Sequence, residues 1–468
     1  MADSTYPDFY TLPSSPTVTC QDRFGLLDSP TLDVPFWSVL IALLNPPIHS
    51  LPSFVSIVES IAIELRGTSP PDYSTLQLIL SERKTSFLAA WPSIVRLALD
   101  MPRLFPSHQL PILKEGGIAR LELSRKQVAC LVVHQFLGTM SAPSWQEGFQ
   151  NFEIWYQGEQ VHQRAPGIYL TAVLDYLERV SATSAFSGQD EWKITYELAS
   201  LSGDSKLASH QCDTVLDLQG HVTELGDIFL EPFCERSAEA EYLGTNGNAV
   251  VISANRFIGF GRSATQEEVF VGTTPGACPA VLVTPPLASH QVLVVRGCEA
   301  MVKTVGQGRQ ISLAGGHNLE ADGHGPHKNM WWSRTMLFMD ALELDSFDDE
   351  QYPDIKHANL KREFIKATVG FGTGQYSRIY TGLWGCGAFG GDPGVKMVIL
   401  WLAASIQGSA LTVTYEAERE DFARSILAFV DKVKDRRHRV SDIMQLLWTA
   451  EGNGLAKGTF LDWAMSRF

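Results

Sequence analysis

A run of glycines near the end of the chain constrains the fold more than any other feature. Five glycines lie between Gly382 and Gly391, directly before the apolar stretch at residues 395–406. Glycines let backbone amides come close to a phosphate, and the unpaired amides of a following helix point at the same place. A tight turn needs only one or two glycines. The run therefore predicts a diphosphate-binding loop between a strand and a helix.

The same run allows a second interpretation. Residues 385–390 match the spacing Gly-x-Gly-x-x-Gly, and the predicted strand at residues 411–415 ends beside Glu416. A dinucleotide-binding fold places its ribose-binding acid at that point. Against this interpretation, fewer than a hundred residues follow the run. An oxidoreductase would also need a catalytic residue in a second domain, and we find none.

A second segment pairs glycines with acids. A predicted strand at residues 250–252 leads into a loop with Gly259 and Gly261, and a helix that begins near Thr265 carries Glu267 and Glu268. Acids are common in a first helical turn because the helix dipole favours them. Adjacent helical residues point about 100° apart, so one carboxylate can bind while the other catalyses. Neighbouring, partly buried carboxylates also raise the pKa of one of them, as a general acid requires.

The pattern of apolar residues along the sequence changes near Ala185. Before it, apolar residues recur at helical spacing, and Ser124 with Gln127 forms a candidate capping box. After it, short β-branched runs alternate with helices, which predicts a mixed or parallel sheet covered by helices. We place a helical accessory domain at residues 1–185 and an α/β domain at 186–468. The predicted helices are at residues 39–44, 54–65, 76–88, 127–137, 353–368 and 395–406, and the predicted strands are at 193–198, 249–252, 269–272, 280–284, 292–296 and 411–415.

Composition excludes several classes of protein. A net charge of −15 argues against direct nucleic-acid binding, and the basic run at residues 432–439 is expected to be the exposed face of a helix. Seven scattered cysteines without a Cys-x-x-Cys pair predict reduced thiols. No stretch reaches the ~20 apolar residues of a membrane span, and no secretory signal is found, so we expect an intracellular chain. Three histidines, His317, His324 and His327, are expected in a surface loop, and we expect no metal or other cofactor.

Taken together, the two segments resemble the poly(ADP-ribose) glycohydrolase family. The resemblance rests on residues 254–261 and 266–268 and on the string Trp-Gly-Cys-Gly-Ala-Phe-Gly-Gly-Asp at 384–392, with further matches at 127–131, 136–137 and 339–342. It covers roughly residues 110–468. It implies a macrodomain-like α/β fold packed on a helical domain. It also implies hydrolysis of the ribose–ribose O-glycosidic bonds of poly(ADP-ribose) through an oxocarbenium-like transition state, with release of ADP-ribose.

The resemblance also implies residue roles. Glu268 would be the general acid that protonates the leaving 2′-oxygen and then the base that activates water. Glu267 and Asn255 would hold ribose hydroxyls, the amides near Gly387, Ala388 and Phe389 would bind the diphosphate, and the Phe389 ring would shape the distal ribose pocket. The other expected substrate-binding residues are Gly259, Phe260, Gly261, Gln266, Gly385, Gly390, Tyr415 and Glu241.

The chain departs from the family pattern at three positions. Phe260 stands at the middle position of a loop that has three glycines in the family, and Ile252 stands where the animal enzymes have an aspartate. Thr304 takes the place of an adenine-stacking tyrosine. Phe260 is therefore expected to line or narrow the pocket. Adenine recognition is expected to rest on Tyr415, Gln266 and Glu241, although a tyrosine at the end of a strand is more often a packing residue.

Two other functions remain open at this point. A macrodomain that binds ADP-ribose without cleaving it would keep the glycine loop but would not need Glu267 and Glu268. The dinucleotide-dependent oxidoreductase is the other. The expected partners are poly(ADP-ribose), poly-ADP-ribosylated proteins and ADP-ribose as product. We also expect a monomer in the nucleus, the cytoplasm or both, acting in the DNA damage response and without a membrane partner.

Overall fold

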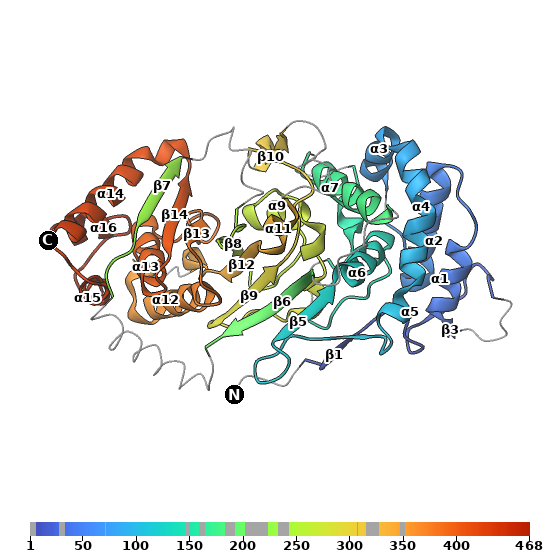
Figure 1. Cartoon of the computed structure of the whole chain (residues 1–468), viewed down its shortest axis with the longest axis horizontal. Helices are drawn as coiled ribbons and strands as arrows, with labels where there is room; N and C mark the ends of the chain where they lie inside the picture. The colour runs from blue at the N-terminus through green and yellow to red at the C-terminus, as the bar shows by residue number, and fades with distance from the viewer. Residues whose placement is uncertain are drawn as a thin grey trace.

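The computed structural model has three regions along its longest axis. It describes residues 6–27, 33–70, 72–145, 149–158, 164–182, 192–201, 223–232, 243–306, 308–314, 327–346 and 352–468. N-terminal helices lie at one end, a large sheet lies in the middle, and C-terminal helices lie at the other end (Figure 1). None of the helices in these ranges is long and apolar enough to cross a membrane.

A mixed sheet of eight strands forms the centre of the molecule. Five neighbouring strands run parallel, and three antiparallel strands extend the sheet on the side of the N-terminal helices. The predicted mixed sheet is therefore confirmed. In spatial order the strands are β5 (Arg120–Ser124), β6 (Lys193–Ser200), β9 (Gln291–Arg296), β12 (Thr335–Asp340), β8 (Ala249–Ala254), β13 (Arg378–Thr381), β14 (Ala410–Tyr415) and β7 (Ile228–Pro232).

Alternate residues of β8 face two different apolar cores. Val250 and Ile252 belong to one core, and Ala249 and Val251 belong to the other. Because successive side chains of a strand point to opposite faces, this alternation shows that both faces of β8 are covered. Burial on both faces explains why β8 reads as a continuous apolar run in the sequence.

The N-terminal helices share the first core with the sheet. They are α1 (Phe36–Leu44), α2 (Leu51–Arg66), α3 (Ser74–Glu82), α4 (Lys84–Leu99), α5 (Met101–Leu104), α6 (Arg125–Leu137) and α7 (Arg164–Ser181). Ser124 and Gln127 form the expected capping box of α6. This region also contains two antiparallel strand pairs, β1 (Phe9–Thr11) with β4 (Gln109–Pro111) and β2 (Thr19–Gln21) with β3 (Asp33–Pro35). Strand β5 lies in the N-terminal region of the sequence but pairs with β6 of the central sheet. The domain boundary predicted near Ala185 lies outside the described residues and stays a prediction.

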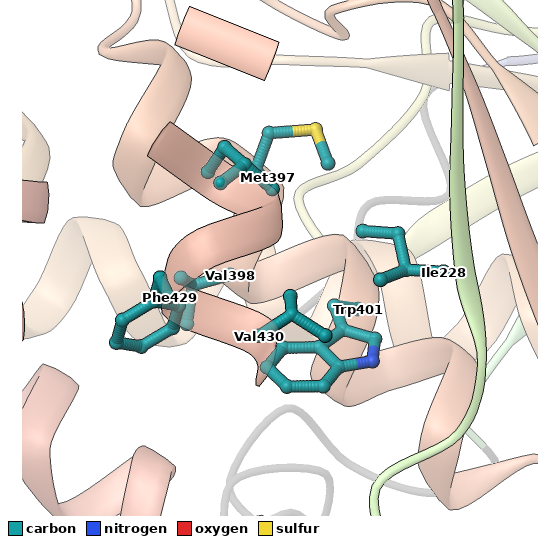
Figure 2. Close-up of a pocket in the computed structure, with 7 residues that line it drawn as sticks. Ile228, Met397, Val398, Trp401, Phe429 and Val430 are labelled. Carbon is teal, nitrogen blue, oxygen red and sulfur yellow. The ribbon is translucent and has the colours of Figure 1, made fainter. Parts of the chain in front are cut away.

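The C-terminal helices cover the other face of the sheet. They are α12 (His357–Phe371), α13 (Pro393–Ile406), α14 (Glu420–Asp435), α15 (Val440–Thr449) and α16 (Phe460–Met465). Met397, Val398 and Trp401 of α13 meet Phe429 and Val430 of α14 beside β7 (Figure 2). The pocket between them is lined by apolar side chains alone. It therefore belongs to the packing that fixes α13 rather than to a polar ligand site.

Two predicted strands are wrong. Residues 269–272 belong to α9 (Gln266–Gly272), and residues 280–283 form α10 (Ala280–Val283). A short apolar run fits a buried strand and a buried helix equally well, so local chemistry decides between them. Thr265 and Glu268 form a capping box that starts α9, and Pro279 directly precedes α10. Strands β5, β7, β12 and β13 of the central sheet were not predicted from the sequence.

Candidate active site

The two predicted segments meet at one edge of the sheet. Strands β8 and β13 are parallel neighbours, with Tyr380 opposite Val250. The loop that leads into α9 and its two acids follows β8, and the glycine loop follows β13. Because parallel strands end at the same edge, both loops rise from that edge side by side.

Glu268 is held by the start of α9. Its Oε2 accepts hydrogen bonds from the Thr265 amide at 3.0 Å and the Ser263 amide at 2.9 Å. In return, the Thr265 hydroxyl oxygen accepts from the Glu268 amide at 3.4 Å, which completes the capping box. Both backbone donors act on Oε2, whereas Oε1 has the Ser263 hydroxyl at 3.3 Å. The helix start thus sets the position of the carboxylate.

Gly261 makes room for that carboxylate. A Cβ atom at residue 261 would lie 1.6 Å from Oε1 of Glu268. The indole nitrogen of Trp155 donates to the Gly261 carbonyl at 2.7 Å, which ties the loop to the 3₁₀ helix η1 (Phe152–Trp155). In the structure, the backbone at Gly261 therefore approaches the carboxylate of Glu268 closely.

Glu267 has a different environment. Its Oε2 accepts from the Asn255 amide at 2.8 Å, while its Oε1 is buried and has no hydrogen-bond partner among the described residues. Burial of the carboxylate raises the pKa of Glu267 to about 8, and the charges of Glu268 and Asp340 add to the rise, whereas the amides of Asn255 and Gly259 oppose it. The carboxyl of Glu267 therefore keeps its proton at neutral pH.

Three other predicted residues of this segment make local contacts. The Asn255 side chain accepts from the Phe257 amide at 3.0 Å. The Gln266 side chain accepts from the Ser253 amide at 3.0 Å and donates to the Val251 carbonyl at 3.3 Å, so it is bound to β8. The third residue is Phe260, which is 9% exposed. Its ring packs on the rings of Phe152 and Trp155, with centroids 5.3 and 5.5 Å apart.

One side of the glycine loop packs against the rest of the protein, and we call it the inner side. Cβ atoms at Gly385 and Gly391 would lie 3.1 and 2.8 Å from side-chain atoms of Lys396, and a Cβ atom at Gly390 would lie 3.0 Å from Cβ of Asp345. Gly385 and Gly390 also have positive φ angles of 74° and 64°. These three glycines are therefore needed by the packing and the backbone of the loop itself.

The loop also has an outer side. Gly382 and Gly387 would place a Cβ atom in open space, and Gly387 and Ala388 are exposed. Within the described ranges, no acceptor takes the amide hydrogens of Gly387, Ala388 or Phe389. Asp392 caps α13 through a 3.0 Å bond from the Val395 amide. The predicted diphosphate amides are thus brought together at the start of a helix.

The residues expected to recognise adenine are not seen to meet at one place among the described residues. Tyr415 ends β14, is 6% exposed and donates to Oε2 of Glu420 at 2.7 Å. Glu241 lies outside the described residues. Thr304 lies on β10 (Thr304–Val305), which pairs with β11 (Ser312–Leu313), and the Gly308 amide between these strands donates to the Ala264 carbonyl at 3.2 Å. Ile252 lies in the apolar core.

Cysteines and possible metal ligands can be placed only among the described residues. The five cysteines that the structure describes are free, and Cys212 and Cys234 lie outside the described residues. No cluster of possible metal ligands occurs in the ranges given above. His317 and His324 lie outside those ranges, and His327 is the first residue of α11 (His327–Trp332).

Asp340 is a charged residue at this edge for which no role was predicted from the sequence. It is the last residue of β12, stands opposite Ala254 of β8 and is 5% exposed. Its carboxylate bonds Arg362 and Lys366, both of α12. Its position at the end of an apolar stretch of sequence was the signal that could have identified Asp340, because ligands of open α/β sheets bind at the carboxyl ends of the strands.

Comparison with known proteins agrees with this architecture. Residues 79–197 match the helical domain of poly(ADP-ribose) glycohydrolase, and residues 233–422 match its Macro domain fold. Poly(ADP-ribose) glycohydrolase 1 of Arabidopsis thaliana is 30% identical over 110 residues, which span 23% of this chain and only 20% of the length of that relative.

Solved structures of poly(ADP-ribose) glycohydrolase from Deinococcus radiodurans with ADP-ribose are also similar. One covers 49% of this chain and 90% of its own, with 13% identity and a TM-score of 0.29. Another covers 47% and 86%, with 13% identity and a TM-score of 0.30. This structural likeness is too weak to argue from, but the two domain matches together span more than half of the chain. The chain therefore belongs to the poly(ADP-ribose) glycohydrolase family.

Proposed function

We propose that the chain hydrolyses the ribose–ribose O-glycosidic bonds of poly(ADP-ribose) and releases ADP-ribose. The observation that carries this proposal is the placement of Glu267 and Glu268 beside a glycine loop with three available amides, at one edge of the sheet. A pocket that only binds a nucleotide needs the loop but does not need the two carboxylates.

Glu268 serves as the acid and then as the base. The bond between the anomeric carbon and the leaving 2′-oxygen breaks, the electron pair stays on that oxygen, and the carboxyl of Glu268 supplies its proton. Water then adds to the oxocarbenium-like carbon and gives a proton back to the Glu268 carboxylate. Both backbone donors bind Oε2, so Oε1 is the oxygen available to carry the proton.

Glu267 binds the sugar. Because its pKa is raised to about 8, its carboxyl is mainly protonated at neutral pH and can donate a hydrogen bond to a ribose hydroxyl. The amides of Gly387, Ala388 and Phe389 bind the diphosphate at the start of α13. The ribose and the diphosphate of one ADP-ribose unit are then held at two points, which fixes the reacting anomeric carbon against Glu268.

The test is release of ADP-ribose from purified polymer. Glu268→Gln keeps an acceptor for the Thr265 and Ser263 amides but has no proton to give. We expect it to lose polymer hydrolysis while it still binds ADP-ribose in calorimetry. Glu59→Gln, on the exposed side of α2, is the matched control. Cleavage at the wild-type rate by Glu268→Gln would contradict the proposal.

The same experiment separates the other candidates. A wild-type chain that binds ADP-ribose but releases none from polymer is a binding macrodomain without hydrolytic activity. A chain that binds NAD more tightly than ADP-ribose is a dinucleotide-dependent protein. The two acids and the family membership favour hydrolysis over both.

The proposal includes the partners. The substrates are poly(ADP-ribose) and poly-ADP-ribosylated proteins, in the nucleus or the cytoplasm, and the acidic net charge of −15 supports the view that nucleic acid does not bind directly. The chain is proposed to act as a monomer without a cofactor. Light scattering during size-exclusion chromatography, with and without ADP-ribose, measures this oligomeric state.

A further inference from the structure

Five charged side chains form a buried cluster behind the glycine loop. Arg362 of α12 bonds Oδ2 of Asp340 and Oε1 of Glu363, each at 2.5 Å, and Lys366 bonds Oδ1 of Asp340 at 2.5 Å. Lys396 of α13 pairs with Oε2 of Glu363. The cluster links the end of β12, the helix α12 and the helix that follows the glycine loop.

Lys396 is the member of this cluster that touches the loop. Its side chain is 2% exposed. A Cβ atom at Gly385 would lie 3.1 Å from its Nζ, and one at Gly391 would lie 2.8 Å from its Cε. Its ammonium also lies 4.7 Å from the centre of the Trp384 ring. Lys396 and Ala341 therefore line the inner side of the loop whose outer side carries the amides of Gly387 and Ala388.

A charge in this place is costly to bury unless it is used or paired. Glu363 pairs with Lys396, but the other oxygen of Glu363 also accepts from Arg362 and from the Leu342 amide at 3.0 Å. The nearby carboxylate of Asp392 is occupied by bonds from the Val395 amide, the Tyr352 hydroxyl and the Gly458 amide. In a poorly hydrated interior, a fixed cation acts over several ångströms.

We propose that Lys396 positions the diphosphate of the substrate by holding the inner side of the glycine loop and placing a fixed positive charge behind it. The inference rests on the proposed function only in assigning the diphosphate to this loop. Lys396 does not touch the substrate, so its contribution to affinity is electrostatic and grows with the number of phosphates that the loop holds.

The structure allows the lysine to be removed without loss of its helix. The apolar side chains that hold α13, namely Met397, Val398 and Trp401, pack against α14 and β7 (Figure 2). Lys396→Met keeps most of the volume beside Trp384 and removes the charge. The double variant Lys396→Met/Glu363→Gln also removes the carboxylate that would otherwise be left buried without its cation.

The test compares the affinities of AMP, ADP and ADP-ribose by calorimetry. In Lys396→Met and in the double variant we expect AMP affinity to fall by no more than a few fold. The affinities of ADP and ADP-ribose should fall by about tenfold or more, equivalent to about 1.4 kcal/mol. With polymer as substrate, KM should rise by more than kcat falls.

Lys366→Met is the matched control. Lys366 is a buried member of the same cluster, but it donates to the carbonyls of Ala288 and Gln291 at 2.8 and 2.6 Å rather than lying against the loop. We expect this variant to have a lower Tm and no preferential loss of ADP over AMP. An equal loss for all three ligands in Lys396→Met and the double variant, or no loss, overturns the proposal.

The outcomes are separate from those of the proposed function. A chain that shows this phosphate dependence but does not cleave polymer contradicts the proposed hydrolysis and supports the role of Lys396. A chain that cleaves polymer and shows no such dependence contradicts the role of Lys396 alone. A wild-type chain that binds none of the three ligands contradicts both.

Discussion

A Cβ atom at Gly261 would lie 1.6 Å from Oε1 of Glu268, so a side chain at residue 261 and the carboxylate cannot occupy their places together. Gly261→Ala must push Glu268 out of its capping position. Since a well-placed acid or base contributes about 10²–10⁴-fold, we expect polymer hydrolysis to fall by roughly 10²-fold or more. The assay is ADP-ribose release under single-turnover conditions.

The control for this substitution is Gly117→Ala. Gly117 is exposed, and a Cβ atom there would meet only ordinary contacts, the nearest at 3.4 Å from Cβ of Lys114. We expect this variant to keep its activity. Full activity in Gly261→Ala would show that the position of Glu268 at the start of α9 is not the catalytic one.

The raised pKa of Glu267 predicts a pH dependence of stability. Between the ordinary pKa of a glutamate and a pKa of about 8, the folded chain holds a proton at Glu267 that the unfolded chain has released. Stability from this group therefore falls as the pH rises from about 5 to 8. Glu267→Gln removes the titration, so the Tm of the wild type should fall relative to that of the variant over this range in thermal unfolding scans.

The same titration predicts a pH dependence of activity. Above pH 8, Glu267 loses the proton that it is proposed to donate to a ribose hydroxyl. We expect the KM of the wild type for polymer to rise through this range, and Glu267→Gln, which keeps a donor, to show a smaller rise. Parallel profiles for the two proteins would remove Glu267 from sugar binding.

Phe260 is expected to govern stability. The sequence suggested that it lines the pocket, but its ring packs on Phe152 and Trp155. Phe260→Ala should lower the free energy of unfolding by about 3 kcal/mol, as large-to-small changes of buried aromatic residues do. Urea unfolding measures this change. Phe257→Ala, in the same loop but only partly buried, is the control and should cost less. A change in ADP-ribose affinity without a change in stability would support the pocket role.

The parts of the site that could be predicted from the sequence are local. A strand, a glycine loop and the start of a helix are contiguous, so Thr265, Glu268 and residues 382–392 carry their own signals. The sequence did not allow us to predict which glycines of the loop pack against the interior and which face open space. A Cβ atom at Gly385 or Gly391 would meet Ala341, the loop backbone and Lys396, whereas Gly387 faces open space. This difference exists only after the loop packs against the rest of the fold.

Long-range contacts account for most of what the sequence missed. Asp340 meets Lys366 only because α12 packs against β12, and Phe260 meets Trp155 only because the helical region packs against the loop after β8. Neither contact has a periodic pattern or a fixed spacing. The short strand β13 was missed for a different reason, since four residues are too few to show alternation.

Asp392 links the glycine loop to Gly458. Gly458 lies after the residues that match the family models, which end at residue 422. Its side chain accepts from the Val395 amide at 3.0 Å, the Tyr352 hydroxyl at 2.8 Å and the Gly458 amide at 2.8 Å. Asp392→Ala leaves these three donors without their acceptor and removes the cap of α13. We expect a loss of about 1–3 kcal/mol in urea unfolding.

Loss of this cap should also weaken ligand binding, because the amides at residues 387–389 and Asp392 belong to the same loop. Titration calorimetry should show a lower affinity for ADP-ribose. Asp431→Asn, on the exposed side of α14, is the control and should leave both stability and affinity unchanged. If Asp392→Ala lowers stability but leaves the affinity at its wild-type value, the cap is not needed to hold the loop in its binding conformation.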